Sequence, residues 1–115
     1  MKQSSCPLRF GFRMIDPRTL PDMTALRAQI DLTDKALMDL LVYRSSLIDR
    51  AIDLKPAAGL PARTADRVEQ VAQNARQNAI DRGFDPDFAE KLWRDLIEWS
   101  IAREERVLGA DGSAS

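Results

Sequence analysis

The stretch DMTALRAQIDLTDKALMDLLVYRSSLIDRAIDLK, residues 22–55, decides the fold of this chain. It contains no glycine or proline, and its apolar residues recur at the three- and four-residue spacing of one face of an α-helix. Asp22 is a suitable N-cap, and Pro56 follows Lys55 as a stop signal. The pattern predicts a helix of about 33 residues with a length of about 50 Å.

Two cations interrupt the apolar stripe of this predicted helix. The stripe consists of Leu26, Ile30, Leu37, Leu40, Leu41, Leu47, Ile48 and Ala51. Arg44 and Lys55 fall in phase with it, and at about 100° per residue they share one face roughly 16 Å apart. Because an unpaired buried charge is costly, these cations need an anion, which either the chain or a ligand supplies.

A second helix is predicted from Thr64, its N-cap, to Arg82, with Gly83 as a left-handed stop. Its stripe is made of small residues: Val68, Val71, Ala72, Ala75 and Ala79. The preceding segment, residues 56–61, contains two prolines and a glycine and is expected to form a loop.

A third helix is predicted to begin at Asp85-Pro86, a cap followed by proline at the first helical position, and to continue to Leu108. Gly109 is expected to close it. Its apolar face is defined by Trp93, Leu96, Ile97 and Val107. No strand pattern appears, so the predicted fold class is all-α, a three-helix chain with one long first helix.

The remaining helical residues are too few to cover so long a first helix, so we expect it to pack along a partner chain. The alternative is a break near Asp31–Thr33 and a monomeric bundle. Residues 1–21 lack a helical period and are expected to form a flexible arm, before a helical domain at 22–109. Residues 110–115 are expected to be a disordered tail.

Composition excludes several functions. The 17 basic and 18 acidic residues nearly balance, so nucleic acid is not an expected partner. No run of 18 apolar residues indicates a membrane span, and we expect a cytoplasmic location. Cys6 is the only cysteine and there is no histidine, so zinc sites and Ser-His or Cys-His nucleophilic chemistry are excluded. No metal and no cofactor are expected.

Polar residues also interrupt the stripes of the other helices. Ser100 and Glu104 lie one turn apart within the apolar sector of the third helix, and Arg67 stands in the first turn of the second. With Arg44 and Lys55 they make a set of three cations and one acid. The excess of positive charge predicts a binding site for a small dianion.

Each of these residues has a simpler explanation. Arg44 can pair with Glu104 or Asp34, and the ammonium of Lys55 can extend past the end of its helix to water. The Ser100 hydroxyl can bond to a carbonyl of its own helix, and Arg67 can point to solvent.

At these positions the sequence resembles the all-helical chorismate mutases. The residues that carry the resemblance are LRAQIDLTD at 26–34, Leu40-Leu41 with Arg44, then Lys55, Arg67, Ser100 and Glu104. The resemblance covers roughly residues 23–108. It implies an intertwined helical homodimer in which the long first helices pair and each chain contributes to both active sites.

The resemblance also implies roles. Arg27 is roughly 260° from Arg44 around the helix and would reach the partner's site, whereas the other residues belong to the home site. Arg27 and Arg44 would clamp the two carboxylates of chorismate, and Arg67 and Ser100 would also bind the substrate. Lys55 and Glu104 would hydrogen-bond the ether oxygen as the C–O bond breaks. The implied activity converts chorismate to prephenate, a step of aromatic amino-acid biosynthesis.

Two departures from the family pattern keep other functions open. Val68 stands where chorismate mutases carry a glutamate for the substrate hydroxyl, and the related isochorismate–pyruvate lyases also lack that acid. Many relatives have glutamine at the position of Glu104, so Glu104 would have to be protonated to donate, and activity should rise towards acidic pH. The alternatives are therefore an isochorismate–pyruvate lyase, or a non-catalytic helical dimer that binds a ligand or a partner.

Overall fold

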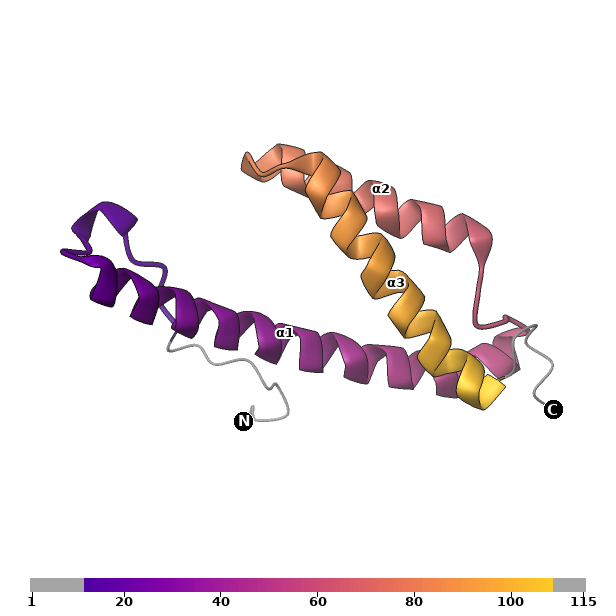
Figure 1. The fold of residues 1–115 in the computed structure, drawn as a ribbon. Coiled ribbons are helices and arrows are strands. Elements are labelled where there is room, and N and C mark those ends of the chain that lie inside the picture. Colours follow the sequence, from indigo (N-terminus) through magenta and orange to yellow (C-terminus); the bar gives the residue numbers. More distant parts are fainter. Residues whose placement is uncertain (1–11, 109–115) are drawn as a thin grey trace. The chain divides into compact units, whose positions relative to one another are not determined.

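The computed structural model describes residues 12–108, which form helices and the segments that join them. The elements are η1 (Pro17–Thr19, a short 3-10 helix), α1 (Met23–Ala58), α2 (Ala65–Arg82) and α3 (Pro86–Leu108) (Figure 1). The all-α class with a long first helix is confirmed. No helix in this part of the chain is long and apolar enough to cross a membrane. Cys6, Gly109 and the predicted tail at 110–115 lie outside the described residues.

Asp22 sets the start of α1, as predicted. Its carboxylate Oδ1 accepts a hydrogen bond from the backbone N–H of Ala25 at 2.9 Å and so satisfies one of the free donors of the first turn. The helix continues through residues 31–33 without interruption. The alternative of a break at Asp31–Thr33 is therefore wrong.

The prediction that Pro56 ends the first helix is wrong. Pro56 lies inside α1, which runs to Ala58. Proline lacks an N–H and crowds the preceding turn, but only the last two residues of α1 follow it, so little helix remains to be disrupted. Gly59, with φ of 73°, ends the helix instead. The Leu60 N–H donates to the Lys55 carbonyl at 2.9 Å and closes this C-terminal cap.

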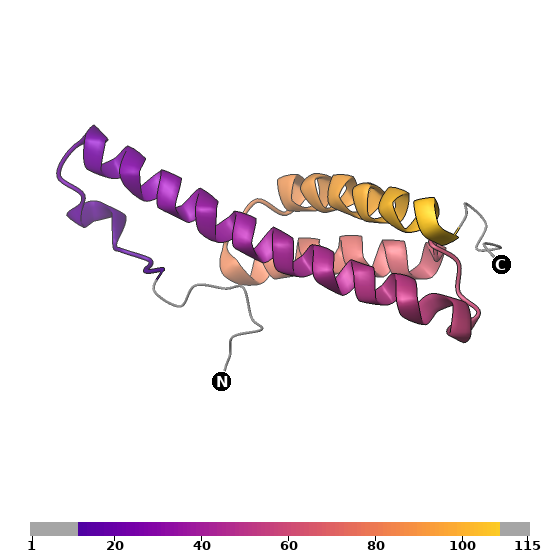
Figure 2. The ribbon, with the colours of Figure 1, turned by 90° about the horizontal axis from the view of Figure 1, so that it is seen from below.

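The chain divides into two compact units, Met1–Leu47 and Ile48–Ser115, and the boundary falls within α1. In the described part of the first unit, the segment before α1 runs back alongside the first turns of the helix (Figure 2). Gln29 Nε2 donates to the Arg13 carbonyl at 3.1 Å and ties this segment to α1.

The apolar stripe of α1 is largely uncovered in the single chain. No residue of α1 is buried. Five members of the stripe in the first unit are each 40% exposed or more: Ile30, Leu37, Leu40, Leu41 and Leu47. Exposed apolar surface of this kind is typical of regions that contact another molecule.

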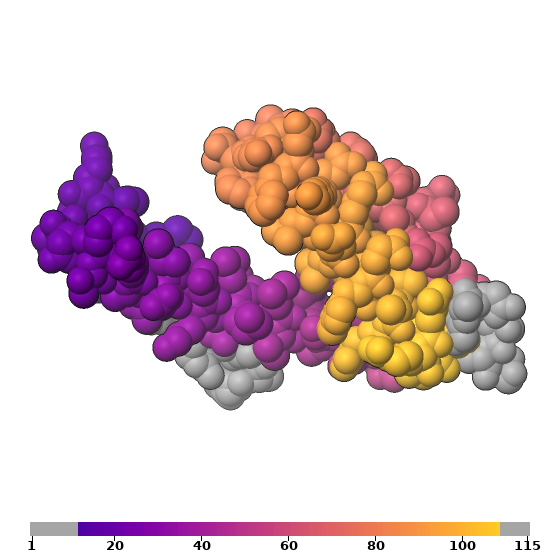
Figure 3. All heavy atoms as spheres, viewed as in Figure 1, coloured from indigo at the N-terminus to yellow at the C-terminus, as the bar shows by residue number. Residues whose placement is uncertain are grey.

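In the second unit, α2 and α3 form an antiparallel hairpin, and the side chains around their turn pack together in the space-filling view (Figure 3). Gly83 occupies the left-handed region with φ of 74° and ends α2, as predicted. Asp85 Oδ1 accepts hydrogen bonds from the N–H groups of Asp87 and Phe88 at 3.0 and 3.1 Å. This cap starts α3 at Pro86, again as predicted.

Thr64 precedes α2 as predicted, although its side chain makes no capping hydrogen bond.

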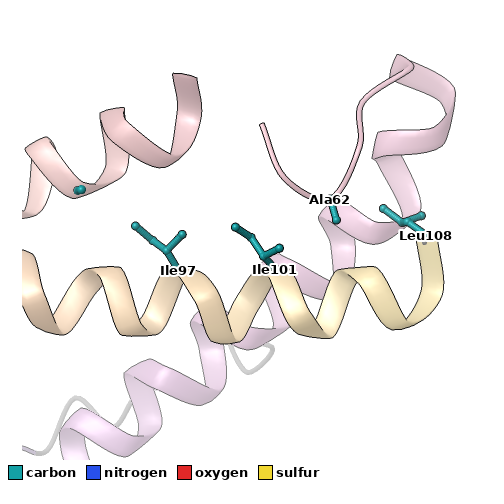
Figure 4. Packing of buried hydrophobic residues seen from close by; sticks show 5 residues of the cluster. Ala62, Ile97, Ile101 and Leu108 are labelled. Carbon is teal, nitrogen blue, oxygen red and sulfur yellow. The ribbon is translucent and has the colours of Figure 1, made fainter. Parts of the chain in front are cut away.

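The core of the second unit lies between α2, α3 and the loop that follows α1. The buried cluster consists of Ala62, Ala72, Ile97, Ile101 and Leu108. In Figure 4, Ile97 and Ile101 project from the same side of α3, and Ala62 of the loop lies beside Leu108. Small residues on α2, with Ala72 fully buried, let the two helices approach closely.

The predicted apolar face of α3 is wrong at one residue, Val107. Val107 is 60% exposed, and its neighbour Leu108 is buried in its place. Ile97, Ile101 and Leu108 follow the spacing that keeps side chains on one face, whereas Val107 is turned about 100° from Leu108. Of the other predicted members of this face, Ile97 is buried, and two are half-buried: Trp93 and Leu96.

Candidate active site

An ion pair between a partly buried lysine and a buried glutamate joins the end of α1 to α3 in the second unit. Lys55 lies in the last turn of α1, and its side chain is 18% exposed. Glu104 lies in the last part of α3, and its side chain is 5% exposed. Lys55 Nζ is 2.6 Å from Glu104 Oε1. The structure thus brings together the two residues that the resemblance assigned to the ether oxygen of the substrate.

A backbone group also binds the Lys55 ammonium. Lys55 Nζ donates a hydrogen bond to the carbonyl of Ala62 at 2.8 Å. Burial would make a lone ammonium costly, and this carbonyl together with the Glu104 carboxylate offsets the cost. The sequence-based alternative, in which the Lys55 ammonium extends past its helix into water, is therefore wrong. The ammonium instead contacts the loop after α1 and Glu104 of α3.

Glu104 keeps an unused hydrogen-bonding capacity. Its Oε1 is buried and is held by the Lys55 ammonium at 2.6 Å, and among the described residues no further hydrogen bond reaches it. A carboxyl oxygen can accept more than one hydrogen bond, so Oε1 retains capacity for another donor.

Ser100 is buried one turn before Glu104 on the same face of α3. Its hydroxyl donates to the Leu96 carbonyl at 2.9 Å, which is the bond within its own helix that the sequence allowed. Arg67 lies on the exposed side of the first turn of α2, where its Nη1 donates to Gln70 Oε1 at 2.6 Å. Substrate binding by Ser100 and Arg67 stays a prediction.

Arg27 and Arg44 belong to the first unit. Arg27 is exposed near the start of α1, and Arg44 is half-buried further along the same helix. The pairing of Arg44 with Glu104 was one alternative, and in the second unit Lys55 holds that carboxylate. The substrate contacts predicted for both arginines stay predictions.

Sequence reasoning missed two ion pairs around this site. Arg103, next to Glu104, donates through Nε and Nη2 to the carboxylate of Asp49 on α1, at 2.6 and 3.1 Å. Arg63, next to Ala62, donates to both carboxylate oxygens of Glu98 on α3. These hydrogen bonds hold the pKa of Asp49 and of Glu98 below the ordinary carboxyl value. Surface charges of this kind have many possible partners, so no pattern in the sequence identifies the pairs.

The site offers hydrogen bonding and charge, with no histidine in the chain to shuttle protons. A buried ammonium beside a carboxyl group can stabilise negative charge that develops on an oxygen atom of a bound molecule. This chemistry, on a scaffold of one long and two shorter helices, defines a small all-helical enzyme-like protein whose site is built around a cation.

The comparisons with known proteins specify this class. The model of the family "Chorismate mutase type II" matches residues 26–105, and the chain belongs to this family. The predicted resemblance is thereby confirmed. None of the solved structures is a significant match.

Curated relatives carry two kinds of name. The chain is 36% identical over 83 residues to the T-protein of Enterobacter agglomerans. This match covers 72% of this chain but only 22% of the T-protein. It is 31% identical over 91 residues to the 4-amino-4-deoxychorismate mutase of Streptomyces pristinaespiralis, covering 79% of this chain and 70% of the relative. The enzyme of the same name from Streptomyces venezuelae is 31% identical over 87 residues, covering 76% and 84%.

Proposed function

We propose that this protein is a chorismate mutase that rearranges chorismate to prephenate. The observation that carries the proposal is the contact of the partly buried Lys55 with the buried Glu104, at 2.6 Å, in a chain of the type II chorismate mutase family. The reaction is pericyclic and requires neither a proton shuttle nor a covalent intermediate. An enzyme without histidine can perform it by holding the compact conformer of the substrate and stabilising developing charge.

In this proposal Lys55 and Glu104 are the catalytic residues. The Lys55 ammonium donates a hydrogen bond to the ether oxygen, on which negative charge grows as the C–O bond breaks. Glu104 donates a second hydrogen bond from its protonated form, and its burial beside the Lys55 ammonium supports a role toward substrate. Arg44, Arg67 and Ser100 bind the substrate.

The active enzyme is a homodimer in this proposal, and Arg27 enters the site of the partner chain. The exposed apolar stripe of α1 supports it, because Leu37, Leu40 and Leu41 would be covered by a second helix of the same kind. Arg27 and Arg44 then clamp the two carboxylates of one substrate from different chains. The catalytic domain comprises residues 22–109, after an arm at 1–21.

A second substrate class is favoured by Val68. In the structure Val68 is half-buried and packs against the core cluster, so it offers no hydrogen bond to a ring hydroxyl. The Streptomyces relatives are named for a substrate with an amine at the corresponding carbon. We therefore propose 4-amino-4-deoxychorismate as the second candidate substrate, and isochorismate, cleaved to salicylate and pyruvate, as the third.

A parallel assay with the three compounds tests the proposal. We expect prephenate from chorismate, at a rate that falls by at least about a hundredfold in Lys55→Ala, the size of effect seen on loss of a charge-stabilising donor. Turnover of only the amino compound, or release of pyruvate from isochorismate alone, would replace the proposed reaction by the corresponding alternative.

Ligand binding without turnover is the remaining alternative hypothesis. A dianion that neutralises the cationic site should raise the melting temperature even where no product forms. A shift with chorismate but no product from any of the three compounds would identify a ligand-binding helical protein. No shift and no product would favour a dimer that binds other proteins.

A further inference from the structure

Besides the Glu104 carboxylate, the Lys55 ammonium binds one peptide group of the loop after α1. Its hydrogen bond at 2.8 Å goes to the Ala62 carbonyl, which belongs to the peptide plane that links Ala62 to Arg63. Residues 60–64 have no regular secondary structure, so no helix or sheet fixes the direction of that carbonyl. Its direction depends on what holds the two residues on either side of the peptide bond.

Both of these residues are anchored to the rest of the second unit. The Ala62 side chain is 2% exposed and lies in the core cluster beside Leu108 (Figure 4). Arg63 forms a two-contact ion pair with Glu98 of α3, with Nη1 2.9 Å from Oε2 and Nη2 2.6 Å from Oε1. The two parallel hydrogen bonds fix orientation as well as distance.

We propose that the Arg63–Glu98 ion pair is a positioning device for Lys55, and that it acts through the Ala62 carbonyl. With only Ala62 anchored, the peptide plane can turn about that residue and carry the carbonyl away from Nζ. With Arg63 also held on α3, the plane is fixed at both ends. The ammonium is then kept at its place beside Glu104. The catalytic consequence rests on the function proposed above, whereas the positioning of Lys55 does not.

A matched control pair exists on the same hairpin. Arg94 of α3 donates through Nη1 and Nη2 to both carboxylate oxygens of Glu69 on α2, each at 3.0 Å. The side chains of Glu98 and Glu69 are similarly exposed, and both ion pairs tie α3 to another segment of the second unit. Glu69 is not next to the loop peptide that binds Lys55. Loss of Glu69 or of Glu98 removes a two-contact surface ion pair, with Arg94 retaining its bond to Glu90, and we expect only the loss of Glu98 to affect Lys55.

The first readout needs no substrate. Glu98→Ala and Glu69→Ala are compared by competitive acylation of lysines, followed by mass spectrometry, with Lys35 and Lys91 as internal references. We expect the Lys55 acylation rate to rise several-fold in Glu98→Ala and in Arg63→Ala, because a released ammonium samples solvent more often. The rate should stay at the wild-type value in Glu69→Ala. Equal Lys55 rates in Glu98→Ala and Glu69→Ala would overturn the positioning role.

The second readout is kinetic, with whichever substrate the wild-type protein turns over. We expect kcat to fall on the order of tenfold in Glu98→Ala with little change in KM, since displacement of a reacting group by about 1 Å can cost about a hundredfold. Arg63→Lys, which retains one contact, should recover part of the loss, and so should the exchange of both residues in Arg63→Glu with Glu98→Arg. Glu69→Ala should keep the wild-type kcat.

The outcomes separate the two proposals. If the wild-type chain turns over none of the three compounds, the proposed function fails while the acylation experiment still decides the positioning role. If the wild-type chain is active and Glu98→Ala matches Glu69→Ala in kcat, the catalytic consequence of the ion pair is overturned.

Discussion

Asp49 of α1 and Arg103 of α3 form a two-contact ion pair beside the Lys55–Glu104 contact, with Arg103 Nε 2.6 Å from Asp49 Oδ1. The Asp49–Arg103 and Lys55–Glu104 ion pairs both join α1 to α3 in the second unit. Arg103 directly precedes Glu104 on α3, and Asp49 lies on the same helix as Lys55. The Lys55–Glu104 pair is largely shielded from solvent, whereas the Asp49–Arg103 pair is near the surface. Their different surroundings lead to different expectations for pH.

The Asp49 carboxylate should titrate below the ordinary aspartate value, because the Arg103 guanidinium hydrogen-bonds its charged form and lowers its pKa. A lowered pKa in the folded state stabilises the fold above about pH 4, the unfolded aspartate value, and this stabilisation is lost as pH falls through the lower folded pKa. Arg103→Gln should return the pKa of Asp49 towards the ordinary value. NMR titration of the Asp49 carboxyl carbon measures both, and an unchanged midpoint in the variant would contradict the assigned cause.

Glu104→Gln should remove the pH dependence of turnover. In the wild-type protein, activity should rise towards acidic pH, since protonated Glu104 can donate to the ether oxygen and the carboxylate would repel the charge that develops there. Glutamine donates at every pH. The pH–rate profiles of both proteins test this, with Glu105→Gln, the next residue on α3, as a control that should keep the wild-type profile. Identical profiles for wild type and Glu104→Gln would remove Glu104 from its proposed role.

Two inactive variants should restore activity to each other if the site is shared between chains. In a dimer of Arg27→Ala with Lys55→Ala, one site has Lys55 from the first chain and Arg27 from the second, and the other site lacks both. Random mixing makes half of the dimers mixed, so about a quarter of the wild-type activity should return. Steady-state assays after joint refolding measure it.

The matched control for mixing is the pair Arg44→Ala and Lys55→Ala. Both residues are assigned to the home site, so no arrangement of the two chains yields an intact site and no activity should return. Recovery in this control, or no recovery with Arg27→Ala, would show that the proposed division of residues between chains is wrong.

The packing of α3 leads to a stability prediction. Ile101→Ala should lower the free energy of unfolding by about 2–5 kcal/mol, because it leaves a cavity in the core cluster. Val107→Ala, at an exposed position of the same helix, should change it by no more than about 0.5 kcal/mol. Urea unfolding at one fixed protein concentration compares them, and equal losses would place Val107 in an interface.

Local signals made most of the fold predictable. Asp22, Asp85 and Gly83 act through hydrogen bonds to their own turns, so their effect does not depend on distant residues. The prediction that the first helix ends at Pro56 failed because a proline near the end of a helix destabilises it little when a glycine cap follows. Val107 misled because it is apolar, although the phase set by Ile97 and Ile101 points to Leu108.

The candidate site was partly predictable for a related reason. Lys55 and Glu104 stood out because a charged residue on an apolar stripe must meet a partner, and the two meet each other. The Ala62 carbonyl could not be found in the same way, because every residue has a carbonyl and its direction depends on tertiary structure. The ion pairs of Asp49 and Arg63 depend on which surface charges the fold brings together.

Side-chain mutagenesis at residue 62 cannot reveal the hydrogen bond from Lys55 to the Ala62 carbonyl. An alanine scan passes over this position, since the residue is already alanine, and any other substitution keeps the carbonyl. Larger side chains would instead be rejected for their size, because Ala62 is enclosed by the core around Leu108. Selection at residue 62 would therefore record tight packing and leave no trace of the bond to the ammonium.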